Sequence, residues 1–191
     1  MSSASTTLPT LTYFPAAGRT WGLRIALHKA FGKDGWVDER IQFADWKDLK
    51  PTTPLGSLPT LQLPDGRVMT QCDALTRWAG KKGGLYPNDA TDALVVDEAT
   101  STSFEALNKT PGHGLSVEEK KAARAEYAKG FLSTALTLLE KRIKGPFLIG
   151  DELTIGDLSI VMLTDMICEE DFDYVDPSLI TDRFVGLAKH R

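Results

Sequence analysis

The chain has 191 residues, enough for one large domain or two small ones, and 42% of them are hydrophobic and 25% charged. This composition is ordinary for a soluble globular protein, and the net charge of −4 gives no indication of a nucleic-acid-binding patch. No apolar run approaches the length that spans a membrane.

The N-terminal segment, residues 1–9, is rich in Ser and Thr and has neither a basic region nor an apolar core. We therefore expect a loose tail and no secretory signal. Cys72 and Cys168 lie far apart without metal or disulfide spacing, which indicates free thiols in a reducing, cytoplasmic compartment. The three histidines have no Cys or His partner at ligand spacing, so we expect no metal site.

The first half of the chain mixes strand and helix patterns. Residues 10–14 are β-rich and predict a strand, and residues 21–31 predict a helix after a Pro- and Gly-containing loop. Residues 36–43 predict a second strand with Val37, Ile41 and Phe43 on one face. Residues 44–54 are polar and contain two prolines, so we expect an irregular segment with at most one helical turn.

A β-hairpin is predicted over residues 55–70. Residues 60–63 form its first strand, residues 64–66 its turn and residues 68–70 the returning strand. Pro59 opens the first strand, and its bond to Leu58 fits either a trans proline at a strand edge or a cis proline, the trans form being about ten times commoner. Gln71 and Cys72 then lead into an apolar helix over residues 74–82.

This hairpin places an extended backbone beside a helix N-terminus. Strand-like hydrogen bonds on one side and unpaired helix N–H groups on the other suit a peptide-like anion. The order β-α-β-irregular-β-β-α pairs the first two strands in parallel and closes the sheet with an antiparallel hairpin. The sequence thus predicts a thioredoxin-like α/β domain over residues 10–82.

The second half carries helix patterns alone. Residues 83–89 break the composition and predict a linker, and residues 90–191 predict an all-α domain. Ser116 with Glu119, and Thr154 with Asp157, have capping-box spacing. Helices are expected over residues 90–109, 116–144, 154 onward and 177–191, and the third is expected to be a buried central helix. The residues of the second helix expected to face inward are Ala122, Ala125, Leu132, Leu136, Leu139 and Ile143.

Four blocks of sequence resemble the glutathione transferase family. They are Leu11-x-Tyr13-Phe14 followed by Gly18-Arg19, the stretch Ile41-Gln42-Phe43-Ala44-Asp45-Trp46 with Lys50, Leu58-Pro59, and Gln71-Cys72. The second block is similar to the sigma class in particular, which includes members of the haematopoietic prostaglandin D synthase type. In this family the hairpin carries a cis-proline. The family usually has Ser at the position of Cys72, so one hydrogen-bond donor differs.

The resemblance implies roles for individual residues. Tyr13 is the catalytic residue that stabilises the glutathione thiolate, and Arg19 assists it. The implied glutathione-binding residues are Tyr13, Trp46, Lys50, Ser57, Leu58, Pro59, Gln71, Cys72 and Glu105, the last reaching across a dimer interface. The implied hydrophobic co-substrate site is formed by Phe14, Trp21, Phe104 and Leu107.

Each of these residues also has a purely structural explanation. Tyr13 at a strand end could pack in the core with its hydroxyl at the surface, and Arg19 and Glu105 could be exposed helix residues. Because Cys72 begins a helix, we expect some thiolate character and a mixed disulfide with glutathione.

The sequence and the resemblance together predict a cytoplasmic, homodimeric, detoxifying glutathione S-transferase. Glutathione is the co-substrate, the partners are small hydrophobic electrophiles, and no metal, nucleic acid or membrane is expected. Two alternatives stay open. One is a glutathione-dependent isomerase of the prostaglandin synthase type, and the other is a non-catalytic glutathione- or ligand-binding protein.

Overall fold

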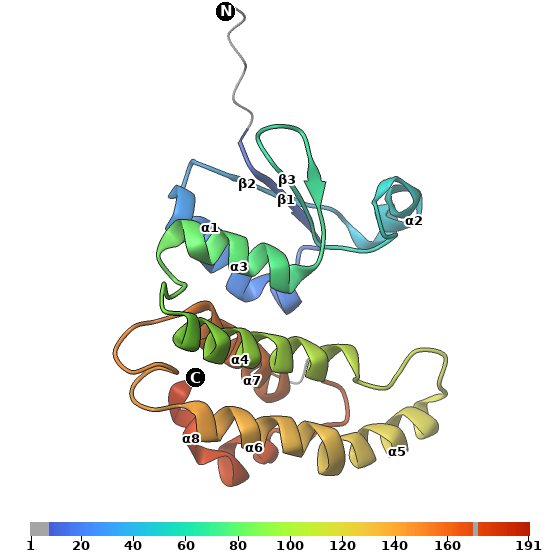
Figure 1. Ribbon diagram of the computed structural model, residues 1–191. Coiled ribbons are helices and arrows are strands. Elements are labelled where there is room, and N and C mark those ends of the chain that lie inside the picture. The colour runs from blue at the N-terminus through green and yellow to red at the C-terminus, as the bar shows by residue number, and fades with distance from the viewer. Residues whose placement is uncertain (1–7, 170–171) are drawn as a thin grey trace, which may run out of the picture. The chain divides into compact units, whose positions relative to one another are not determined.

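The computed structural model describes residues 8–169 and 172–191 (Figure 1). The chain divides into two compact units, Met1–Leu85 and Tyr86–Arg191. Most of the predicted loose tail, residues 1–7, lies outside the described residues. Pro9, at its end, is buried, and its carbonyl accepts a hydrogen bond from the Val37 N–H at 2.9 Å. No helix in the described part of the chain is long and apolar enough to cross a membrane.

The first unit contains a four-stranded mixed sheet in the order β2-β1-β3-β4. Strand β1 (Thr10–Tyr13) runs parallel to β2 (Val37–Arg40) and antiparallel to β3 (Thr60–Gln62). Strand β4 (Val68–Met69) closes the sheet as the second arm of the hairpin. The predicted parallel pair and antiparallel hairpin are confirmed.

Helices α1 (Trp21–Phe31) and α3 (Cys72–Gly83) pack against each other on one side of this sheet (Figure 1). Leu11 and Leu61 are fully buried, and they face each other across β1 and β3. Since side chains alternate along a strand, Thr12, Thr60 and Gln62 point to the opposite face. That face meets the single-turn helix α2 (Trp46–Leu49), which lies within the segment predicted to have at most one helical turn.

The second strand is shorter than predicted. It ends at Arg40, although the Ile41 N–H still donates to the Tyr13 carbonyl at 2.9 Å. Phe43 begins a 3₁₀ turn, Phe43–Asp45, and is 66% exposed, and Val37 is 42% exposed. The prediction of a strand through Phe43 was wrong, because the strand ends at Arg40 and the chain turns at Phe43.

The second unit is all-helical, as predicted. Its helices are α4 (Ala90–Asn108), α5 (Val117–Tyr127), α6 (Ser133–Arg142), α7 (Ile155–Cys168) and α8 (Val185–His190). Helix α7 packs along α4 and is buried along most of its length, which confirms the expected central helix (Figure 1).

The predicted continuous helix over residues 116–144 is interrupted. Residues Ala128–Leu132 form a π-helical turn, and Gly130 has non-helical angles of φ −91° and ψ −109°. Glycine is a weak helix former, so a break is least costly there. Helix α5 on one side of the break has no buried residue, so the inward placement of Ala122 and Ala125 was wrong. Leu132, Leu136 and Leu139 are fully buried, as predicted.

The predicted last helix, residues 177–191, also divides. A π-helical turn covers Leu179–Arg183, and Phe184 leaves the helical region with φ −108° and ψ 60° before α8 begins. Phe184 is buried, so its packing decides the bend. Both predicted capping boxes are present, Ser116 with Glu119 and Thr154 with Asp157.

Candidate functional site

Tyr13 ends β1 and projects toward the loop that follows it. Its hydroxyl oxygen lies 3.2 Å from the point where a Cβ on Gly18 would stand, so the glycine backbone lies directly against it. Gly18 has φ +42°, a region that favours glycine. The loop therefore brings Gly18 and the following Arg19 back to the tyrosine.

The electrostatics keep the Tyr13 hydroxyl protonated. Burial raises the pKa of Tyr13, and the nearby Arg19 guanidinium, which also hydrogen-bonds to it, only partly offsets this effect. Because an ordinary phenol already has a pKa near 10, Tyr13 remains a hydrogen-bond donor at neutral pH. A partly buried donor beside a fixed positive charge is suited to stabilising an anion such as a thiolate.

Cys72 joins this cluster from the first turn of α3. Its thiol donates to the Arg19 carbonyl at 3.1 Å, which ties the helix start to the loop after Tyr13. Burial raises the pKa of Cys72 to about 12. The expectation of thiolate character at this position was wrong, because loss of hydration outweighs the effect of the helix start.

Arg24, in α1, is a site residue that the sequence reasoning missed. Its guanidinium donates to the carbonyls of Phe14 (3.3 Å) and Ala16 (2.5 Å) and to the Thr20 hydroxyl (2.7 Å). It also pairs with Asp38 at 3.1 Å. Arg24 thereby holds the loop between Tyr13 and α1 to the neighbouring strand. A charged residue on the inner face of a short helix was the only available sequence signal.

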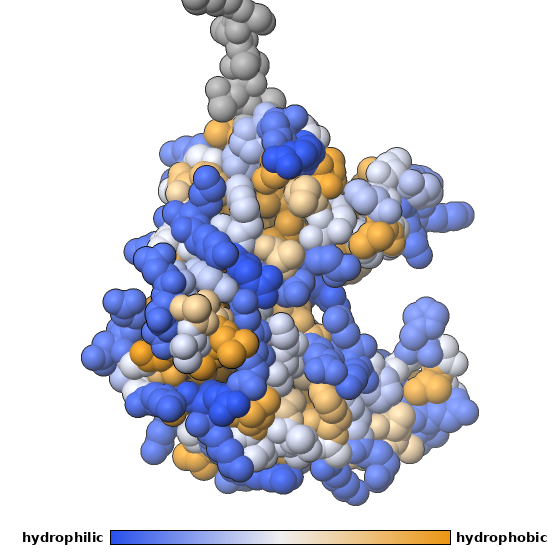
Figure 2. All heavy atoms as spheres, viewed as in Figure 1, coloured by the Kyte–Doolittle hydropathy of each residue, from blue (hydrophilic) through white to orange (hydrophobic). Residues whose placement is uncertain are grey.

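An aromatic cluster extends from Tyr13. The Phe14 ring lies edge-on to Tyr13 at 5.4 Å and to Trp46 at 5.7 Å. Phe43 stacks on Phe14 at 4.5 Å with an angle of 14° between the rings. Figure 2 shows hydrophobic residues reaching the surface of both units among hydrophilic ones, and Phe43 is one of the most exposed. This aromatic surface beside Tyr13 suits a planar apolar ligand.

The segment that leads into the hairpin supplies backbone groups to the candidate site. The Leu58–Pro59 peptide bond is cis, the alternative that the family resemblance favoured, and Pro59 is buried while Ser57 is exposed. Lys50 is exposed, and its side-chain carbons lie 3.6 Å or more from the position of a Cβ on Gly56.

Gln71 immediately precedes α3 and has φ +69°, a conformation that costs energy for a residue other than glycine. Such strain recurs at functional sites. It turns the chain sharply from the hairpin into α3, so the first N–H groups of the helix open beside Cys72 and Tyr13. Trp21, at the start of α1, is partly buried.

The remaining predicted residues belong to α4 in the second unit. Phe104 is 6% exposed and Leu107 is partly buried. Glu105 is exposed and pairs with Lys109 at 2.6 Å, one helical turn away.

Comparison with known proteins identifies the relatives of this chain. Residues 114–188 match the model of the glutathione S-transferase C-terminal domain. The chain is 34% identical to glutathione S-transferase 3 of Caenorhabditis elegans over 183 residues, which cover 90% of this chain and 86% of that protein. It is 27% identical to the class-mu 28 kDa isozyme of Schistosoma japonicum over 95% of this chain and 88% of the relative.

Solved structures show the same fold. Rat hPGDS in complex with a quinoline superposes with a TM-score of 0.79 at 23% identity, covering 95% of this chain and 89% of that one. The sigma-class enzyme of Fasciola hepatica superposes with a TM-score of 0.78 at 22% identity, covering 97% and 89%.

Proposed function

Because the chain belongs to the glutathione S-transferase family, we propose that it transfers glutathione to hydrophobic electrophiles and that Tyr13 activates the thiol. The observation that carries this proposal is the Tyr13 hydroxyl, protonated by burial and flanked by the Arg19 guanidinium. Glutathione is the co-substrate that the family implies.

The chemistry requires the glutathione thiol to ionise near neutral pH. A thiol with a pKa near 8.5 is only about 3% ionised at pH 7, and lowering that pKa by two units needs about 2.7 kcal/mol. A hydroxyl that donates to the sulfur, in a site sheltered from water, supplies energy of this order. The thiolate then attacks an electrophilic carbon, and Arg19 stabilises the charge that develops.

The rest of the first unit provides a place for each part of the tripeptide. We propose that the extended backbone at Leu58 pairs with the cysteinyl residue as an added strand would. The N-terminus of α3, with Gln71 and Cys72, suits the γ-glutamyl carboxylate. The Lys50 ammonium and the Trp46 indole N–H suit the glycyl carboxylate.

The electrophile binds, in this proposal, against the aromatic surface that begins at Phe14. We propose further that Glu105 reaches the γ-glutamyl amine of a partner subunit in a cytoplasmic homodimer. Light scattering after gel filtration measures the assembly, and a mass of a single chain would remove the role of Glu105.

Conjugation of glutathione to 1-chloro-2,4-dinitrobenzene tests the proposal. We expect Tyr13→Phe to lower kcat/KM by about 10- to 1,000-fold, as the loss of one transition-state hydrogen bond of about 1.5–4 kcal/mol predicts. Tyr174→Phe is the matched control, because Tyr174 is 45% exposed in the second unit, and it should retain full activity.

Equal activity of Tyr13→Phe and wild type would remove Tyr13 as the activator. Retention on a glutathione matrix without turnover of any electrophile would favour the binding-protein alternative. In that case, loss of retention in Gln71→Ala would still locate the glutathione site.

A further inference from the structure

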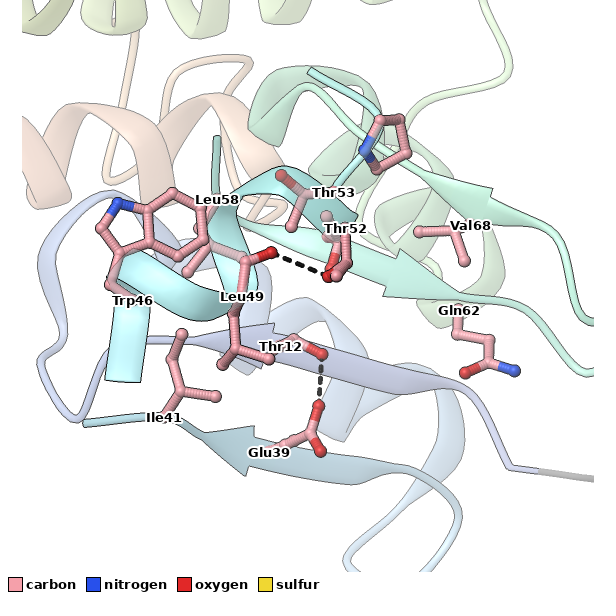
Figure 3. A pocket seen from close by; sticks show the side chains of 12 residues that line it. Thr12, Glu39, Ile41, Trp46, Leu49, Thr52, Thr53, Leu58, Gln62 and Val68 are labelled. Atoms are coloured by element: carbon pink, nitrogen blue, oxygen red, sulfur yellow. Dashed lines mark hydrogen bonds between the residues drawn. The ribbon is translucent and has the colours of Figure 1, made fainter. Parts of the chain in front are cut away.

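We propose that the first unit carries a second ligand site, on the face of the sheet opposite Leu11 and Leu61, which binds a small primary ammonium with an apolar body. The site is a cavity of about 230 Å³ between the sheet and α2 (Figure 3). Trp46 and Leu58 line this cavity and also belong to the glutathione site proposed above, so the two sites adjoin, but ammonium binding does not require the transferase activity.

The alternation of side chains separates this cavity from the Tyr13 hydroxyl. Thr12 and Glu39 line the cavity, whereas their neighbours Leu11 and Asp38 point to the other face. Asp38 accordingly pairs with Arg24 behind the Tyr13 loop. The sheet therefore stands between the cavity and the Tyr13 hydroxyl, and a ligand in the cavity does not need the tyrosine.

Three hydroxyls of the lining offer acceptors. The hydroxyls of Thr12, Thr52 and Thr53 each have one hydrogen, and each already donates it: to Glu39 Oε2 at 2.6 Å, to the Leu49 carbonyl at 2.7 Å and to the Lys50 carbonyl at 2.9 Å. These three hydroxyls can therefore only accept hydrogen bonds from a ligand. A group with several N–H donors fits this arrangement.

The charge of the cavity lining is negative. Glu39 is the only charged residue among the described residues that line the cavity, and Thr12 occupies one of its two carboxylate oxygens. The second oxygen, Oε1, is left for a ligand. A primary ammonium has three donors and one positive charge, so it matches both the carboxylate and the threonine oxygens.

Apolar side chains define the rest of the ligand. Trp46 and Leu49 from α2, with Ile41 just after β2, lie together on one side of Thr12 and Glu39 in Figure 3. The volume lies below the range of about 300–1,000 Å³ that is usual for drug-sized ligands. An arylalkylamine with one ring and a short chain matches the size and the apolar lining of this cavity.

Calorimetric titration of the full chain with 2-phenylethylammonium tests the site. The neutral 2-phenylethanol and the anionic 3-phenylpropanoate have the same ring and are the comparison ligands. We expect the ammonium to bind at least tenfold more tightly than either, and its affinity to fall with added salt because Glu39 is exposed.

Glu39→Gln is the decisive variant. Glutamine keeps an acceptor for Thr12 and removes the charge, and we expect ammonium binding to weaken about 10- to 100-fold, as for a lost charge-assisted hydrogen bond. Asp34→Asn removes one exposed charge outside the cavity and should change the affinity less than twofold. Tyr13→Phe should also bind the ammonium as wild type does.

Three results would overturn the proposal. They are no heat of binding at millimolar ammonium, equal affinity for the alcohol, and unchanged affinity in Glu39→Gln. A folded Glu39→Gln protein is verified by its far-ultraviolet circular dichroism, and Thr12→Val provides a second test. Valine keeps the shape of Thr12 and releases Glu39, so we expect weaker binding there too.

Discussion

Replacement of Asp157 by asparagine should destabilise the helical unit. Asp157 is fully buried at the start of α7. Its carboxylate accepts from the Leu148 N–H at 2.6 Å, from the Thr154 N–H at 2.7 Å and from the Thr154 hydroxyl at 2.6 Å. His190 Nε2 lies 3.1 Å from Oδ1. One side chain thus joins the start of α7 to the preceding loop and to α8.

The magnitude follows from counting partners. An asparagine oxygen can replace Oδ2 and keep both contacts with Thr154, but its NH₂ group then faces the Leu148 N–H, donor against donor. The loss of a charge-assisted hydrogen bond costs about 1.5–3 kcal/mol, and leaving a buried N–H unsatisfied costs about 1–3 kcal/mol more. We therefore expect a loss of about 3–5 kcal/mol in the free energy of unfolding.

The effect should depend on pH. Burial by itself raises the pKa of Asp157, but the nearby His190 imidazole and the hydrogen bonds from Thr154 and Leu148 outweigh it, so the pKa is lowered. A lowered folded-state pKa means that the carboxylate stabilises the fold above the unfolded pKa of about 4 and that this stabilisation is lost as the pH falls. The difference between wild type and Asp157→Asn should be full at pH 7 and should shrink below pH 4.

Urea denaturation followed by circular dichroism at pH 7, 5 and 3 measures this difference. Asp151→Asn is the matched control, because Asp151 is exposed in the loop before α7, and it should change the stability by less than about 0.5 kcal/mol. The reasoning fails if Asp157→Asn is as stable as Asp151→Asn at pH 7, or if its deficit is as large at pH 3.

Three further outcomes are expected near the Tyr13 site. Gly18→Ala places a Cβ 3.2 Å from the Tyr13 hydroxyl at φ +42°, and displacement of the hydroxyl should lower kcat/KM with a generic electrophile by about 10- to 100-fold. In mass-spectrometric thiol labelling at pH 7.5, Cys72 should react more slowly than Cys168, because its thiol is buried and burial raises its pKa to about 12, and equal labelling would refute its burial. Arg24→Lys removes the guanidinium that donates to the Phe14 and Ala16 carbonyls and to the Thr20 hydroxyl, so urea denaturation should show a loss of about 1–3 kcal/mol in the free energy of unfolding, together with lower activity. Unchanged stability and activity would show that the loop does not need these hydrogen bonds.

Local patterns were predicted well because their causes are local. The capping boxes at Ser116 and Thr154 join residues three apart, and the hairpin turn at Asp65 closes within a few residues. The patterns around Leu11 and Leu61 were enough to predict the strands that carry them.

Some interruptions of the helices were not predicted from the sequence. The predicted helix is interrupted at Gly130, where glycine makes a break least costly, and the last one bends at the buried Phe184. Phe43 fits a strand by alternation, but the strand ends at Arg40 and the chain turns at Phe43, whose ring stacks on Phe14 instead.

The same division holds for the candidate site. The sequence places a tyrosine at a strand end, a proline before a hairpin and a thiol at a helix start. Their chemical state depends on the folded structure, which partly buries Tyr13 beside Arg19 and preserves its hydroxyl as a donor. The fold also buries Cys72, which keeps its thiol protonated. Ionisation depends on hydration and on charges brought close in space, and neither is encoded in the spacing of residues along the chain.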